Sequence, residues 1–172
     1  MLYQRLLGQR FKLLPEVLQH FHGSRTTRSA EGLFRVRQGK GLFRAFLAFV
    51  LGFPRSGDEI PVRLDVHGFG EREDWTRRFG DQTLKSVQTF KNELLCERVG
   101  AFEILQRVEV EKGLLRHISV SARFCGIRLP DLLAPRVQSE VEAGHNGWFV
   151  HVAIDAPILG RILEYSGNVK VL

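Results

Sequence analysis

The stretch that decides the fold runs from residue 60 to residue 99 and reads IPVRLDVHGFGEREDWTRRFGDQTLKSVQTFKNELLCERV. Apolar residues occupy every second position at its start, at Ile60, Val62, Leu64 and Val66. This period of two is typical of a strand that buries one face. Gly80-Asp81, between two such runs, predicts a tight hairpin. The stretch therefore predicts consecutive antiparallel strands.

The same pattern continues to the C-terminal end of the chain. Further alternating runs are separated by turn residues at 111–113 and 142–147, and no helical pattern lies between consecutive strands after Ile60. Short connections of this kind favour an antiparallel meander over parallel crossover units. A meander of about nine or ten strands must curl or close to protect its edges. We predict an α+β fold dominated by a strongly curved half-barrel or an up-and-down barrel.

The first part of the chain differs from this pattern. Apolar residues at spacings of three and four predict an amphipathic helix over 3–22, broken at Pro15, and a strand over 30–37 follows. Residues 42–52 are apolar on nearly every side and predict a helix that is a buried core helix, a lid over an apolar cavity or an interfacial anchor. We expect this apolar helix to lie against the sheet. The length of 172 residues fits a single domain over 1–172.

Charge and composition exclude several classes of protein. Hydrophobic residues make up 44% of the chain, and 25 basic against 19 acidic side chains give a net charge of +6. The basic residues are scattered and interleaved with acids, so we expect no nucleic-acid partner, whereas contact with an anionic membrane surface stays an alternative. No apolar stretch reaches the ~20 residues of a membrane-spanning helix. The chain has two cysteines and no export signal at its start, so we expect a cytoplasmic protein. Peripheral association with a membrane is the alternative.

No motif in the sequence predicts catalysis, a metal or a cofactor. Phosphate-binding loops, dinucleotide fingerprints and nucleophile elbows are absent from the sequence. His20 and His22 are two positions apart, which on a helix directs their rings to different faces. His117 and His151 fall on strand faces that we predict to be polar. The sequence therefore favours a protein that is not an enzyme.

Charged residues on strand faces that should be apolar are the best candidates for a site. Two of these residues are arginines: Arg77 shares a predicted face with Trp75 and Phe79, and Arg116 shares one with Leu114 and Ile118. The other two are glutamates: Glu97 shares a predicted face with Leu95 and Val99, and Glu164 shares one with Ile162. A buried charge is costly unless it is paired, so one explanation is internal ion pairs or arginine stems lying on apolar surface. The other is a cavity in which an arginine holds an acidic headgroup through paired hydrogen bonds. The candidate ligand-binding residues are Trp75, Arg77, Arg78, Phe79, Glu97, Arg116 and, from the apolar segment, Phe46.

A series of motifs along the chain resembles a mostly bacterial domain family. The motifs are Leu2-Tyr3-Gln4-Arg5-Leu6-Leu7-Gly8, Phe21-His22-Gly23, Gly52-Phe53-Pro54, Trp75-Thr76-Arg77-Arg78-Phe79-Gly80, Glu97-Arg98-Val99-Gly100, Gly126-Ile127-Arg128-Leu129-Pro130 and Tyr165-Ser166-Gly167. Together they are similar to the domain of unknown function 4166 over essentially the whole chain. The resemblance implies a domain that occurs alone or attached to saccharopine-dehydrogenase-like oxidoreductases, and it implies no particular activity or ligand.

Three hypotheses for function follow. The preferred one is a non-enzymatic module that binds a hydrophobic or lipid-like acidic ligand in a cavity between the sheet and the apolar helix. The second is a catalytic or accessory domain of an oxidoreductase-associated system, using Glu97 or Glu164 with Arg77. The third is a protein-interaction domain that docks its apolar helix on a partner or on a second copy. The residues leave the oligomeric state open.

Overall fold

The N-terminal helices come first in the computed structural model, which describes residues 1–24, 26–41 and 52–172. The expected helix over 3–22 is three short elements: α1 (Leu2–Leu7), the 3-10 helix η1 (Gly8–Leu13) and α2 (Glu16–Gly23). Pro15 lies immediately before α2, because its fixed φ and missing N–H suit a helix start and not a helix interior. The predicted break at Pro15 is confirmed.

The rest of the described chain is almost entirely strands joined by short turns. The strands are β1 (Arg28–Gln38), β2 (Gly57–Phe69), β3 (Arg72–Phe79), β4 (Gln82–Lys91), β5 (Leu94–Val99), β6 (Phe102–Glu111), β7 (Leu114–Phe124), β8 (Ile127–Arg128), β9 (Arg136–Ala143), β10 (Gly147–Ala156) and β11 (Gly160–Val171). Gly80 and Asp81 alone connect β3 to β4, which is the predicted hairpin.

The strands close into an antiparallel barrel. The order around the sheet is β6-β5-β4-β3-β2-β1-β11-β10-β9-β7-β8. Because β6 also pairs with β7, ten of these strands form a closed ring, and the short β8 pairs only with β7. The first strand of the chain pairs with the last, with Ala30 opposite Val171. Closure satisfies the backbone groups that an open sheet would leave at its edges. The predicted antiparallel fold is confirmed, and of the two predicted forms the barrel is the observed one.

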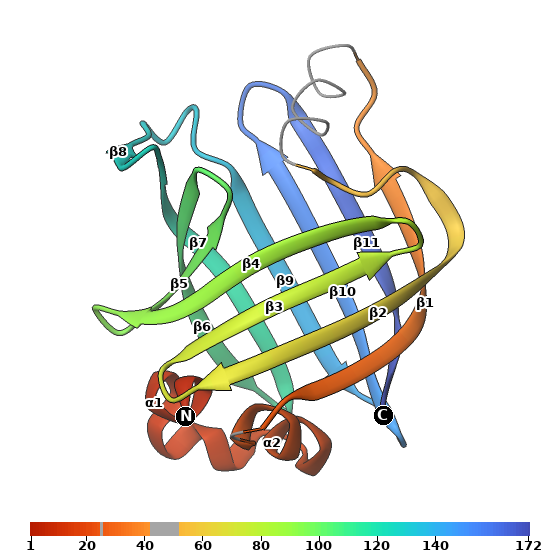
Figure 1. Ribbon diagram of the computed structural model, residues 1–172. Coiled ribbons are helices and arrows are strands. Elements are labelled where there is room, and N and C mark those ends of the chain that lie inside the picture. Colours follow the sequence, from red (N-terminus) through yellow and green to blue (C-terminus); the bar gives the residue numbers. More distant parts are fainter. Residues whose placement is uncertain (25, 42–51) are drawn as a thin grey trace.

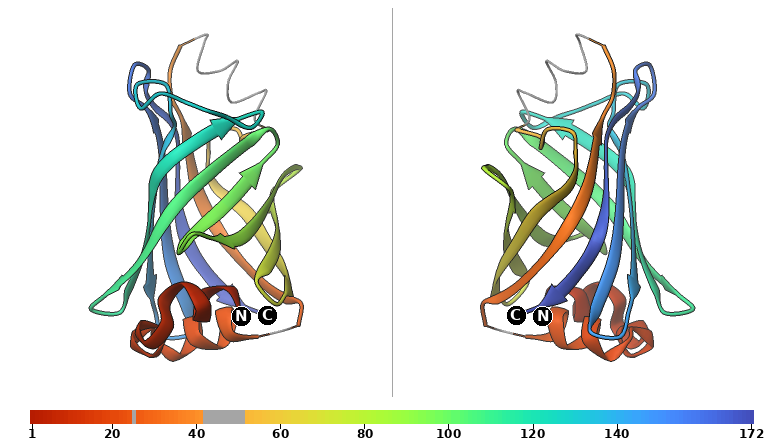
Figure 2. Two further views of the ribbon diagram at one scale, coloured as in Figure 1. Left: turned by 90° about the vertical axis from the view of Figure 1, so that its left-hand side faces the viewer. Right: turned by 90° about the vertical axis from the view of Figure 1, so that its right-hand side faces the viewer.

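The N-terminal helices lie across one end of the barrel (Figures 1 and 2). Their apolar faces point inward, and Leu2, Tyr3, Leu18 and Phe21 are buried almost completely. Both chain termini lie at this end. The β10–β11 turn and the segment between β8 and β9 lie at the opposite end. The helices therefore form a floor beneath the interior of the barrel.

The apolar helix expected over 42–52 lies outside the described residues, except for Gly52, which is part of a turn. Within the described ranges, no helix is long and apolar enough to cross a membrane.

A bulge in β7 alters which side chains face the interior. Leu105 of β6 pairs with Ser121 and Gln106 pairs with Ser119, so Val120 has no partner on β6. One extra residue reverses the alternation of inward and outward positions. Leu115 and His117 are buried before the bulge, and Ala122 is buried after it. The prediction of one continuous apolar face through Leu114, Arg116 and Ile118 was therefore wrong for the first half of this strand.

Candidate ligand-binding site

A cavity of about 650 Å³ lies inside the barrel. Ligand pockets are typically ~300–1,000 Å³, so this space is large enough for a small molecule. Its wall consists mainly of apolar and aromatic side chains from most of the strands, among them Phe34, Val62, Leu84, Ile104, Val137, Trp148, Val152 and Ile162. Tyr3, Phe21 and His22 contribute to it from the helical floor. The cavity therefore lies between the N-terminal helices and the barrel wall.

Four of the candidate site residues line this cavity together. Trp75, Arg77 and Phe79 project from the inner face of β3, as their alternate spacing predicts, and Glu97 projects from β5. Trp75 and Phe79 are buried, and the Arg77 guanidinium carbon lies 4.8 Å from the centre of the Trp75 ring. This contact places the cation against an aromatic face, where it gains electrostatic stabilisation.

The other three candidates are placed elsewhere or not placed. Arg78 follows Arg77 on β3 and therefore points outward, where it forms an ion pair with Asp65. Arg116 precedes the β7 bulge and also points outward, with its Nε atom 3.0 Å from Glu140. The structure thus removes both arginines from the cavity wall. Phe46 lies outside the described residues.

Arg77 and Glu97 form an ion pair on the cavity wall. The Nη2 atom of Arg77 lies 3.3 Å from Oε1 of Glu97, and Nη1 donates to the Ser86 hydroxyl at 2.8 Å. Ser86 and Gln106 donate to the two Glu97 oxygens at 2.7 and 2.9 Å. Burial raises the pKa of the Glu97 carboxyl, but Arg77 and these hydrogen bonds outweigh it, so the pKa is below its usual value. The internal ion pair weighed from the sequence is therefore the arrangement present.

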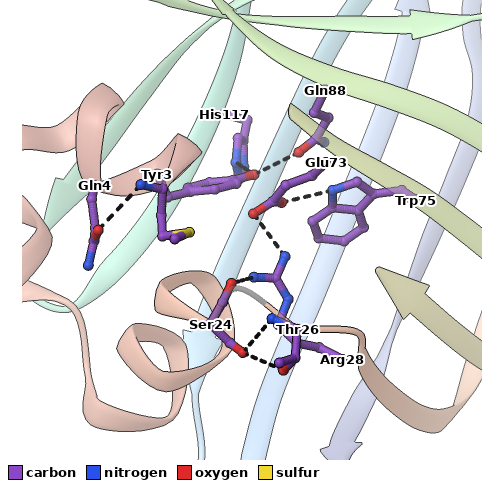
Figure 3. A network of polar contacts seen from close by, with 10 residues as sticks. Tyr3, Gln4, Ser24, Thr26, Arg28, Glu73, Trp75, Gln88 and His117 are labelled. Atoms are coloured by element: carbon purple, nitrogen blue, oxygen red, sulfur yellow. Dashed lines mark hydrogen bonds and ion pairs between the residues drawn. The ribbon is translucent and has the colours of Figure 1, made fainter. Parts of the chain in front are cut away.

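A second polar cluster joins the floor to the wall (Figure 3). The Tyr3 hydroxyl donates to Oε1 of Gln88 at 3.2 Å and lies 3.0 Å from Nε2 of His117. The Tyr3 hydroxyl therefore bridges the Gln88 amide and the His117 ring. Burial lowers the pKa of His117 to about 4. Nδ1 of this ring is buried, and among the described residues it has no hydrogen-bond partner.

His22 gives the floor another neutral polar group. Its ring lies 3.8 Å from the Tyr3 ring between centres, and it also lines the cavity. Burial, with Arg28 nearby, lowers the pKa of His22 well below its usual value. Within the described part of the chain His22 makes no side-chain hydrogen bond, so its polarity is available to a ligand in contact with the floor.

Beneath this cluster lies a buried ion pair that supports the floor (Figure 3). Arg28 of β1 lies 2.8 Å from the Glu73 carboxylate of β3, which also accepts a hydrogen bond from the Trp75 indole at 3.0 Å. Arg28 donates to the backbone carbonyl of Ser24 at 2.8 Å. Burial raises the pKa of Glu73, opposed by Arg28. The hydrogen bond to Ser24 connects the end of α2 to the barrel, and Glu73 holds the Trp75 indole in place on the wall.

These positions define what the cavity can do chemically. Arg77 is the only described lining residue with a cationic side chain at neutral pH, and Glu97 neutralises it. Tyr3, His22, Gln88 and His117 are uncharged hydrogen-bonding groups at one side of the cavity. Most of the remaining lining residues are apolar, with Glu31, Gln106 and Ser139 as further polar members. Such a wall suits an apolar molecule that carries a neutral polar group.

Sequence reasoning missed most of this polar cluster. Gln106 shares its inward face with Ile104 and Val108, and this polar interruption of an apolar face could have identified it. His117 was assigned to the polar face because nothing in the sequence reveals the bulge at Val120. The contribution of Tyr3 and His22 depends on where the helices dock, which periodicity does not specify.

Of the two glutamates in the enzymatic alternative, the structure brings Glu97 to Arg77 but places Glu164 elsewhere. Glu164 of β11 is partly exposed, and it pairs with His151 and Arg161, at 2.8 and 2.7 Å. Glu164 is not among the cavity-lining residues, whereas Arg77 is. Among the described residues, no group of three or more His, Cys, Asp or Glu side chains is arranged to hold a metal ion.

Comparison with known proteins gives one match. No curated protein matches the chain, and neither does any solved structure. A family model, described as Domain of unknown function (DUF4166), matches residues 14–169. This range includes all the described strands except the last two residues of β11, and most of the residues that line the cavity. The chain therefore belongs to the DUF4166 family.

Proposed function

We propose that this domain is a non-enzymatic binding module for a hydrophobic, lipid-like small molecule held inside the barrel. The observation that carries the proposal is the cavity of about 650 Å³, with its apolar wall and its polar cluster beside the floor. Interiors of folded proteins are normally close-packed, and voids larger than a water molecule are few. An interior space of this size is therefore best explained by an occupant.

The polar groups favour an uncharged end group on that ligand. An acidic headgroup, as expected from the sequence, would have to compete with Glu97 for Arg77, which already has an anionic partner. Near Tyr3 and His117, a hydroxyl or carbonyl group would meet neutral donors and acceptors instead. The ligand class that fits is a long-chain or polycyclic alcohol or ketone.

Native mass spectrometry of the protein purified from cells tests the proposal. We expect a co-purified adduct of lipid-like mass, and we expect added dodecanol to bind the delipidated protein more tightly than dodecanoate does. If dodecanoate binds more tightly than dodecanol, and Arg77→Met abolishes this binding, the result would support the acidic ligand expected from the sequence.

A matched pair of variants localises the binding. Leu84 lines the cavity and is buried, so Leu84→Trp fills part of the space and should reduce dodecanol binding at least tenfold. Leu33 is 59% exposed, so Leu33→Trp should bind like the unmodified protein. No adduct together with no dodecanol binding by the unmodified protein would refute the proposed function.

A further inference from the structure

The end of the barrel opposite the helical floor carries a group of exposed apolar side chains. We call Phe124, Ile127, Leu132, Leu133 and Ile158 the apolar rim; they are 44–73% exposed. All of them except Ile127 also line the cavity, and Ile127 lies directly opposite Phe124 in the β7–β8 ladder. The rim is therefore one surface that leads into the cavity, unlike single exposed apolar residues scattered over a protein.

The segment that supplies most of the rim is also basic. Residues 123–136 contain three arginines and one aspartate, a net charge of +2. Arg123 and Arg128, both exposed, lie directly opposite each other in the β7–β8 ladder. Like charges in this position repel each other. An anion lying near both side chains would relieve this repulsion.

The nearest acidic groups are already engaged by other cations. Arg123 lies opposite Glu103 in the β6–β7 ladder, but the Glu103 carboxylate is bonded to Lys91 at 2.8 Å and to Arg98 at 3.3 Å. Along the described chain, neither Arg123 nor Arg128 forms an ion pair with a carboxylate. Among the described residues, these two arginines beside the rim therefore have no carboxylate partner of their own.

We propose that the apolar rim and these arginines dock the end of the barrel opposite the helical floor onto an anionic lipid bilayer. Leucine, isoleucine and phenylalanine side chains would enter the headgroup region, and the arginines would pair with lipid phosphates, as in other interfacial contacts. Docking in this orientation places the cavity mouth against the source of a lipid-like ligand. That last consequence rests on the proposed function, but the membrane contact itself does not.

Flotation with vesicles tests the proposal. We expect the full chain to bind vesicles of phosphatidylcholine with phosphatidylglycerol, to bind phosphatidylcholine alone weakly, and to dissociate at high salt. Each arginine near an anionic surface strengthens binding by about fivefold, so Arg123→Gln/Arg128→Gln should weaken it by roughly twenty-fivefold. Arg10→Gln/Lys12→Gln removes the same charge from exposed positions on η1 and should have little effect.

A second matched pair of variants tests the contribution of the apolar side chains to vesicle binding. Leu132→Ser/Leu133→Ser should reduce vesicle binding at least tenfold, whereas Leu13→Ser/Phe69→Ser, at equally exposed positions away from the rim, should not. Equal losses in the rim and control variants, or no binding to anionic vesicles, would overturn the proposal. So would a stable dimer that dissociates in Leu132→Ser/Leu133→Ser, because the rim would then be covered by a second copy.

Failure of this proposal can be distinguished from failure of the proposed function. The Arg123→Gln/Arg128→Gln variant should still bind dodecanol in the absence of vesicles, because Arg123 and Arg128 do not line the cavity. Vesicle binding without dodecanol binding would refute the ligand hypothesis alone. Dodecanol binding without vesicle binding would refute the docking surface alone.

Discussion

Two ion pairs inside the barrel each join strands that are separated by one intervening strand of the sheet. Arg77 and Glu97 join β3 to β5, with side chains about 15% exposed, and Arg28 and Glu73 join β1 to β3. Removing one partner of a buried pair leaves an uncompensated charge, which is more costly than removing both. Arg77, which the sequence suggested as a headgroup ligand, thus has a structural role in the described protein.

At this residue scale, we predict that Glu97→Gln lowers the free energy of unfolding by about 3–5 kcal/mol, because it leaves Arg77 buried without a counter-charge. The double variant Arg77→Met/Glu97→Gln should recover most of this loss. Chemical denaturation of the two single variants and the double variant measures the coupling. Additive losses would show that the two side chains do not act as a pair.

His117 gives a second prediction at the residue scale. Its pKa of about 4 in the folded protein lies below the ~6.5 of an unfolded chain, so the unfolded state binds more protons between these values. The stability contributed by the neutral ring is fully present above about pH 6.5 and falls as the pH decreases toward 4, by about 3 kcal/mol in total.

Denaturation at several pH values measures this effect. His117→Asn should show a shallower loss of stability than the unmodified protein between pH 6.5 and 4. His145→Asn, at an exposed turn position, serves as the control and should retain the original slope. Parallel pH profiles for all three proteins would contradict the burial of a neutral His117.

At the scale of elements, the bulge at Val120 determines which half of β7 faces inward. Before the bulge, Leu115 is completely buried while its neighbour Leu114 is only partly covered. If the alternation around Ala122 continued unbroken toward the start of β7, Leu114 would face the interior and His117 would face solvent. The structure has the opposite arrangement. Bulges of this kind redirect side chains near binding sites.

The two leucines make the bulge testable. Leu115→Ala should cost about 2–5 kcal/mol of unfolding free energy, the usual range for a buried leucine. Leu114→Ala should cost less than about 1 kcal/mol, as expected for a partly exposed side chain. Urea denaturation compares them, and a larger loss for Leu114→Ala would contradict the described register.

At the scale of the whole molecule, the described residues form a barrel whose floor is made from the N-terminal helices and whose interior contains a cavity of about 650 Å³. An unfilled apolar space forfeits packing contacts along its lining. A ligand that binds only the folded barrel therefore stabilises it by mass action.

The resulting prediction concerns thermal stability. Dodecanol at about a hundred times its dissociation constant should stabilise the delipidated protein by about 2.7 kcal/mol, which for a chain of this size raises the melting temperature by roughly 5–10 °C. Differential scanning calorimetry measures the shift. Leu84→Trp should show a smaller shift than Leu33→Trp, and equal shifts would place the binding outside the cavity.

The local pattern of the sequence determined the elements and their class. Alternation at period two, turn residues at short intervals and Pro15 in the helical segment are properties of adjacent residues, so they predicted the strands, the hairpin at Gly80-Asp81 and the broken helix. The inward faces of β3 and β5 were also predictable, because no bulge interrupts them.

Only the tertiary structure decided how these elements make a site. Closure of the barrel depends on the pairing of β6 with β7, and the polar cluster depends on Tyr3 meeting Gln88 and His117 from three distant segments. Arg77 and Glu97 were both named from the sequence, but their pairing required the register of β3, β4 and β5. Contacts between residues far apart in the chain depend on packing and on strand register, and the local periodicity of a single sequence specifies neither of them.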